Sequence, residues 1–184
     1  AVSGSPLLTD ELAARAWWVM PDSDQARRML KCESVVKGKM GPVLAEFLLE
    51  FLPFEQEAEQ IIESVRLVLQ PGLIDDEACL SIWKRGRQKN VFMVGFLFVT
   101  PDSLPEPTAG HGQFQEYQQR LKSLSSTGNP YAIQLLRLLS VPGQTFLQAC
   151  HTVLRKPSNQ DVVVALLDAI VRYLSDVRVS PFHY

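Results

Sequence analysis

The 184-residue sequence has few of the residues that build cross-links or redox centres. It contains three cysteines, which lie far apart and belong to no Cys-x-x-Cys pattern: Cys32, Cys79 and Cys150. An odd, scattered set of this kind is typical of a reducing compartment. We therefore expect an intracellular protein, in the cytoplasm or the nucleus, whose cysteines act as small buried apolar residues.

Histidine is equally scarce, and none of His111, His151 and His183 belongs to a Glu-x-x-His or His-x-x-x-His pattern. Those spacings place two ligands on one face of a helix in zincins and di-iron proteins. Cys150 and His151 are adjacent, so on a helix they diverge by about 100° and need a distant third ligand to share a metal. The sequence therefore predicts no metal site and no cofactor.

Long apolar runs and a strong charge excess are also missing. The longest apolar run, residues 91–99, is half of the roughly 18 residues that a membrane-spanning helix needs, and it contains Gly95. The net charge is −2 and the mean hydropathy is +0.01. We expect no membrane association, and nucleic-acid binding has only weak support because no global basic excess exists.

Motifs for catalysis are absent as well. The segment 37–41 is rich in glycine and lysine but lacks the spacing of a phosphate-binding loop, and no Gly-x-Ser-x-Gly motif occurs. The acidic groups at 55–57 and 75–77 stand where helices begin, and negative charge stabilises a helix there. We predict no catalytic residues, and the remaining alternative is a Cys–His pair that meets only in the fold.

The residues that are present have helical periodicity almost throughout. Caps, prolines and glycines divide the chain into about ten short helices. The expected ranges are 10–20, 24–37, 42–52, 55–70, 75–86, 91–99, 113–124, 131–140, 144–155 and 159–177. Thr9, Ser23 and Ser158 are the expected caps of three of them, and the apolar segment 42–53 is expected in the middle of the structure.

The segment 91–99, VFMVGFLFV, is the one ambiguous element, because periodicity does not distinguish a buried strand from a buried helix. Its valines and phenylalanines favour a strand. No second strand is available to pair with it, and an unpaired strand would leave its backbone polar groups unsatisfied. We therefore predict a helix and an all-α fold.

Helix pairs begin near positions 9, 42, 75, 113 and 143, a spacing of 30 to 38 residues. This spacing is typical of helical-hairpin repeats, although no side-chain consensus recurs with it. Two architectures remain open, an irregular HEAT-like stack and a closed helical bundle. We expect one domain over residues 1–184, with the proline- and glycine-rich loop 101–112 as the candidate for an internal boundary.

Two features predict recognition rather than packing. The first is a basic segment that places four cations in six residues at a helix end: Lys84, Arg85, Arg87 and Lys89. Cations are favoured at a helix C-terminus, but four exceed what one helix end requires. The second is the pair Trp17–Trp18, because adjacent residues diverge on a helix and one tryptophan can remain near the surface as a contact residue.

These observations predict a protein–protein interaction domain that acts as a helical scaffold or as an adaptor subunit of a larger assembly. The expected partner is another protein, with an acidic surface where it meets the basic segment. The first alternative is a small α-helical chaperone or assembly factor that binds an apolar peptide. The second is a helical enzyme whose site is assembled from scattered residues.

Overall fold

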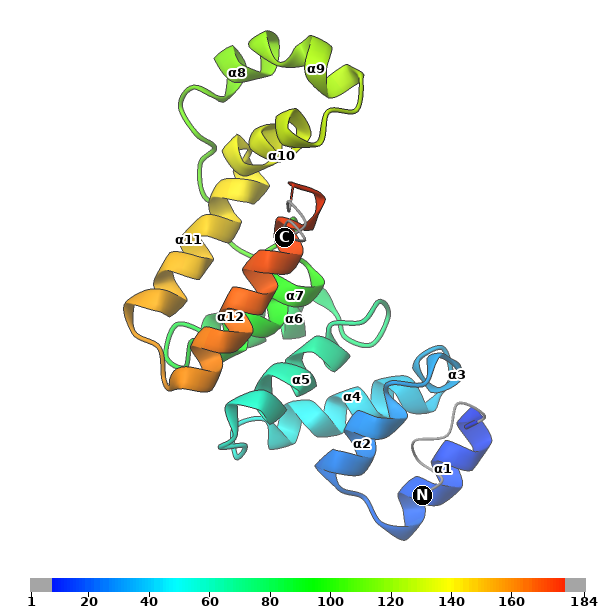
Figure 1. Ribbon diagram of the computed structural model, residues 1–184. Coiled ribbons are helices and arrows are strands. Elements are labelled where there is room, and N and C mark those ends of the chain that lie inside the picture. Colours follow the sequence, from blue (N-terminus) through cyan, green and yellow to red (C-terminus); the bar gives the residue numbers. More distant parts are fainter. Residues whose placement is uncertain (1–7, 178–184) are drawn as a thin grey trace, which may run out of the picture.

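The computed structural model describes residues 8–177, and every regular element in that range is helical, which confirms the predicted all-α fold (Figure 1). Residues 1–7 and 178–184, which include His183, lie outside the described range. The elements are α1 (Asp10–Val19), α2 (Ser23–Met29), α3 (Glu33–Val36), α4 (Met40–Phe51), α5 (Ala58–Val68), α6 (Asp76–Arg85), α7 (Val91–Val99), α8 (Phe114–Arg120), α9 (Lys122–Ser126), α10 (Pro130–Leu139), α11 (Val141–Arg155), α12 (Gln160–Tyr173) and the 3₁₀ helix η2 (Ser175–Val177).

The helices are arranged along an elongated molecule. Figure 1 shows α1 to α4 at one end and α8 to α10 at the other, with α5, α7 and α12 between them. Helix α12 packs against α5 and α7 as well as against its sequence neighbour α11. In a regular stack of helix pairs, each pair contacts only its neighbours in sequence, and the contact of α12 with α5 departs from that pattern. A HEAT-like repeat therefore stays a prediction.

Helix α7 is the centre of the structure. Seven of its nine residues, from Val91 to Leu97, are buried, and it packs against α5, α6, α11 and α12. The prediction of a helix over residues 91–99 is confirmed. Gly95 is required where α7 crosses α5, because a Cβ atom there would lie 2.4 Å from Cγ1 of Val65.

The expectation that segment 42–53 lies in the middle of the molecule is wrong. Helix α4 buries one face, but Val43 and Phe51 are exposed. The helix also begins earlier than expected, at Met40. The carboxylate of Asp10 accepts hydrogen bonds from the backbone N–H groups of Lys39 and Met40, both at 2.9 Å, and so caps α4 from another helix.

The expected helix 24–37 is divided in two, and Asp22 rather than Ser23 caps the first part. The division has a packing reason. Met29, Leu30 and Val35 are all fully buried. On a continuous helix, at about 100° per residue, Val35 would face roughly 120° away from Met29. The turn between α2 and α3 allows these side chains to enter the same core.

The expected helix 113–124 is likewise divided, into α8 and α9, which curve over α10 (Figure 1). No residue of either helix is buried. Both short helices contact α10, and the bend between them lets the chain follow its surface.

The expected helix 144–155 begins earlier than predicted, because α11 starts at Val141 and includes Pro142 and Gly143. Proline is compatible with the first helical turn, where no backbone donor is needed. At Gly143 a Cβ atom would lie 2.0 Å from the carbonyl oxygen of Arg137, so glycine lets α10 and α11 meet closely. Helix α12 is capped by Asn159 rather than by Ser158.

Two arginines tie distant elements together. The buried guanidinium of Arg27 on α2 pairs with Asp24 at 2.6 Å and donates to Ser64 Oγ on α5 at 3.1 Å. On α10, Arg137 donates from Nε to Asp102 Oδ1 at 2.9 Å and stacks on the ring of Tyr173, 3.8 Å from its centroid. The second group fixes the start of loop 101–112 to α10 and α12.

We predict that Gly95→Ala destabilises the protein. The added methyl group must displace the branched Cβ of Val65 at the α5–α7 crossing, and overpacking of this kind costs about 1–3 kcal/mol. This cost outweighs the higher helix propensity of alanine, which is worth about 1 kcal/mol. Urea denaturation followed by circular dichroism measures the change. Gly112→Ala, in open space, is the control, and equal stability of both variants would contradict the prediction.

Candidate functional site

The basic segment lies where α6 ends and the chain turns into α7. Lys84, Arg85 and Arg87 are exposed, and Lys89 is half-buried. The four cations do not act alike. Lys89 donates from Nζ to the backbone carbonyl of Glu55 at 2.9 Å, and Arg87 is ion-paired. Arg85 forms no ion pair with any residue in the range 8–177.

The partner of Arg87 is Glu106, in loop 101–112. Its carboxylate accepts hydrogen bonds from Arg87 Nη2 at 2.6 Å and from the indole Nε1 of the buried Trp83 at 3.1 Å. Glu106 lies between two prolines and has a left-handed backbone (φ 58°), which is unfavourable for a non-glycine residue. The hydrogen bond from Arg87 is the main cause that lowers the pKa of Glu106. Arg87 therefore holds a strained loop in place.

The structure adds a second set of cations that sequence reasoning missed. The turn from α6 to α7 and the C-terminal end of α11 form the two walls of a surface cleft of about 730 Å³. We call it the basic cleft, and its main residues are Arg87, Lys89, Asn90, His151, Arg155 and Lys156. Arg155 and Lys156 follow Lys84, the first cation of the basic segment, by about seventy residues, so no local pattern connects them with it.

Asn90 joins the two walls of the basic cleft. Its Nδ2 donates to the backbone carbonyls of Lys156, at 2.6 Å, and Val153, at 3.4 Å, and its Oδ1 accepts from Ser158 Oγ at 3.2 Å. The amide thus satisfies carbonyl groups at the end of α11 that have no partner within the helix. Its position just before the buried helix α7 gives the cleft a rigid floor.

The two tryptophans diverge as predicted. Trp17 is half-buried and packs edge-on against Phe47 of α4, with 4.7 Å between the ring centroids. Trp18 is 87% exposed. The residue that follows Trp18, Val19, is 85% exposed, so the last turn of α1 presents apolar side chains to solvent.

Further aromatic residues continue this surface along α4. Phe47 stacks on Phe51 at 4.4 Å, and Phe51 is 6.4 Å from Phe54, whose side chain is 77% exposed. Met20 and Glu55 line one shallow hollow, which places the end of α1 beside the end of α4. We call the exposed set the aromatic surface: Trp18, Val19, Met20, Phe51 and Phe54.

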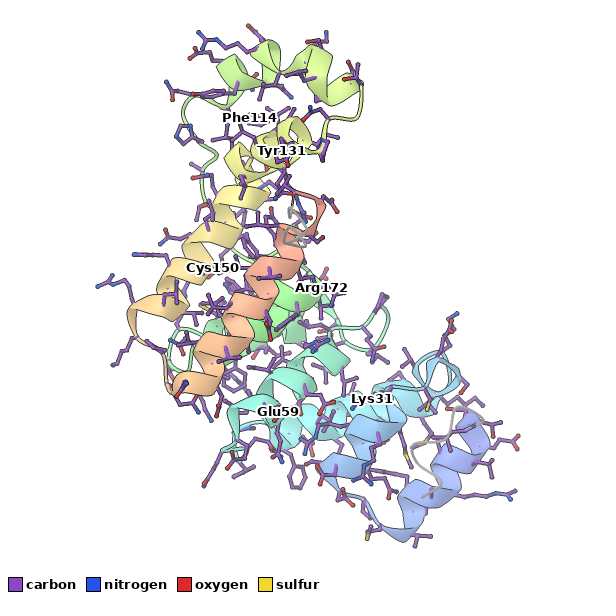
Figure 2. All side chains as sticks on the ribbon, viewed as in Figure 1. Lys31, Glu59, Phe114, Tyr131, Cys150 and Arg172 are labelled. Atoms are coloured by element: carbon purple, nitrogen blue, oxygen red, sulfur yellow. The ribbon has the colours of Figure 1, made fainter. Side chains whose placement is uncertain are left out.

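A third feature is an acidic groove of about 410 Å³ between α5 and α12. Glu59 and Glu63 line it on α5, and Asp161 and Asp168 line it on α12. Figure 2 shows Glu59 at the start of α5, on the side of the molecule that α12 approaches. The groove gives this face a charge opposite to that of the basic cleft.

Burial makes two of the three cysteine thiols less reactive. Cys150 is a buried residue of α11 (Figure 2), and burial raises the pKa of its thiol to about 12. Cys79 is half-buried, and desolvation raises its pKa too. A thiol of raised pKa stays protonated and is a poor nucleophile. Among residues 8–177, no three histidine, cysteine or acidic side chains are grouped as metal ligands.

No protein family, curated protein or solved structure with which the chain was compared matches it. No helix in the described range has both the length and the apolar character needed to cross a membrane. The basic cleft and the aromatic surface are therefore the candidate sites that the described residues offer.

We expect opposite outcomes for charge reversal at the two neighbouring arginines. Arg87→Glu places a carboxylate against Glu106 and should lower the free energy of unfolding by about 1 kcal/mol, since the pair is largely exposed. Arg85→Glu should change it by less than about 0.5 kcal/mol. Thermal or urea denaturation of both variants measures the difference, and equal effects would show that Arg87 has no structural role.

The same ion pair predicts a pH dependence. Because the folded-state pKa of Glu106 is lowered, its ionised form stabilises the fold above the ordinary glutamate pKa, and this contribution is lost as the pH falls through the lowered value. The stability difference between the wild type and Arg87→Gln should therefore shrink on acidification below about pH 5. Denaturation curves across that range test this, with Arg85→Gln as the control.

Proposed function

We propose that this chain is a protein–protein interaction domain that acts as a helical scaffold or adaptor subunit of a larger assembly. The observation that carries the proposal is the aromatic surface, where Trp18 and Phe54 expose 87% and 77% of their area. Single exposed apolar residues are ordinary on protein surfaces, whereas several of them on two helices that pack together, as α1 and α4 do, favour an interaction site.

The composition of the surface supports a protein partner. Tryptophan and other aromatic residues contribute most of the binding energy in many protein interfaces, because they bury large areas with few rotatable bonds. The exposed carboxylates of Glu46 and Glu50 lie on the same helix as Phe51 and border the set. An apolar centre with a charged rim is the usual anatomy of an interface. The occupant that fits is an apolar helix or loop of another protein.

The rigid base of the aromatic surface supports docking without rearrangement. Trp17 and Phe47 lie beneath it in edge-on contact, and Phe47 packs in turn on Phe51. Phe51 therefore stands on an aromatic neighbour that is itself held between α1 and α4. Less conformational entropy is lost on binding when the contact residues are already ordered.

The alternatives have less support. A chaperone that binds an apolar peptide needs an apolar groove. In each of five surface hollows formed by residues 8–177, polar and charged lining residues outnumber apolar ones. An enzyme with a Cys–His pair needs a reactive thiol, and the buried Cys150 beside His151 has a raised pKa of about 12. Both observations favour a binding module.

The test is a comparison of variants of the full chain in co-purification. Trp18→Ala and Phe54→Ala should each lower the recovery of a specific partner by at least tenfold, because truncation of an interface hot spot costs roughly 2 kcal/mol or more. Their own melting temperatures should stay within a few degrees of the wild type, since both side chains are exposed. Quantitative mass spectrometry of the co-purified proteins measures the recovery.

Tyr131→Ala is the matched control, because Tyr131 is also an exposed aromatic residue but lies on α10 at the opposite end of the molecule (Figure 2). Its partner recovery should equal that of the wild type. If all three variants recover the same proteins equally well, the aromatic surface is not the docking site. A concentration-dependent mass lost only in Trp18→Ala would instead identify a second copy of the chain as the occupant.

A further inference from the structure

We propose that the basic cleft binds a short acidic segment of a protein, one rich in aspartate and glutamate. This inference deepens the proposed function by assigning a second contact to the partner, and it rests on that function. It starts from a juxtaposition that only the fold creates, because the turn after α6 and the end of α11 bring their cations to one cavity.

The cleft offers cations that the fold itself does not use. Arg155 and Lys156 are exposed and form no ion pair with any residue between 8 and 177. Arg85 lies on the adjoining surface, which shares Gln88 with the cleft, and it is equally unpaired within that range. Like charges held close together repel one another, and an anionic ligand relieves that repulsion.

The charged side chains that line the cleft are all basic. None of the residues that line it is an aspartate or a glutamate, whereas the acidic groove and the hollow at Met20 both mix charges. His151 and Gln148 on α11 add side chains that can donate hydrogen bonds to carboxylate oxygens. A volume of about 730 Å³ accommodates several side chains of an extended peptide.

The cleft is also preorganised. Asn90 fixes its two walls through the carbonyls of Val153 and Lys156, and Lys89 is held by its hydrogen bond to the Glu55 carbonyl. The cations therefore need not be gathered when a ligand arrives. Preorganisation of this kind lowers the entropic cost of binding.

Two observations favour a protein segment over a nucleic acid. No phenylalanine, tyrosine or tryptophan lines the cleft, and single-stranded nucleic acids depend on such rings for base stacking. The positive surface is also short. Asp161 follows the cleft residue Ser158 by three residues, and Asp168 lies further along α12. A long phosphate backbone that left the cleft in this direction would meet negative charge, whereas a short peptide fits within it.

The test uses a fluorescently labelled peptide of eight glutamates and a single-stranded oligonucleotide of the same net charge, each titrated against the purified full chain at low salt. The peptide should bind, and its affinity should fall as salt is added. Arg155→Glu/Lys156→Glu should weaken peptide binding at least tenfold. The control Arg15→Glu/Lys122→Glu carries the same change in net charge at exposed positions elsewhere and should bind within twofold of the wild type.

Equal weakening in both double variants would show a general charge effect and overturn the proposal, as would the absence of peptide binding to the wild type. Tighter binding of the oligonucleotide would overturn it in favour of nucleic acid. Melting curves of Arg155→Glu/Lys156→Glu verify that it is folded, and Arg155→Gln/Lys156→Gln supplies a milder variant in case it is not. Trp18→Ala should bind the peptide like the wild type. A negative result for the basic cleft is therefore distinguishable from a negative result for the aromatic surface.

Discussion

The crossing of α5 and α7 is the constraint on which the rest of the structure depends. At Gly95 the two helices approach so closely that no side chain fits between them. Helix α7 is buried on several sides, because α5 covers one of them and α11 and α12 cover others. The N-terminal helices reach this centre through α5, and the C-terminal helices reach it through α11 and α12. The close packing at Gly95 therefore helps to set the relative position of the basic cleft and the aromatic surface.

Local signals predicted much of the fold. Thr9 and Asp75 cap helices as their sequence context indicates, and the run that begins at Val91 is a helix. The errors arise where tertiary contact overrides a local signal. Gly143 reads as a helix terminator, but it lies inside α11 because the backbone of α10 occupies the space of a side chain. The cap of α4 comes from Asp10, thirty residues earlier in sequence, and no local pattern reveals it.

The candidate sites show the same limit. The basic segment and the divergent tryptophans are local patterns, so they are visible in the sequence. The role of Arg87 is not, because its partner Glu106 lies in a loop nineteen residues away. Arg155 joins the cleft through a contact that spans more than sixty residues, which Asn90 makes with the end of α11. The sequence therefore predicts which residue types are available, and the fold decides which of them are already paired.

The absence of buried residues in α8 and α9 has a consequence for how the molecule opens. Hydrogen exchange reports such openings, and regions with few buried apolar contacts open at a lower free energy than the core. The amides of these two helices therefore exchange through sub-global openings that leave α7 closed. We expect them to behave as a separate cooperative unit, a foldon, whose contacts with the rest of the fold run through α10. The unfolding temperature of the core would then describe only part of the chain.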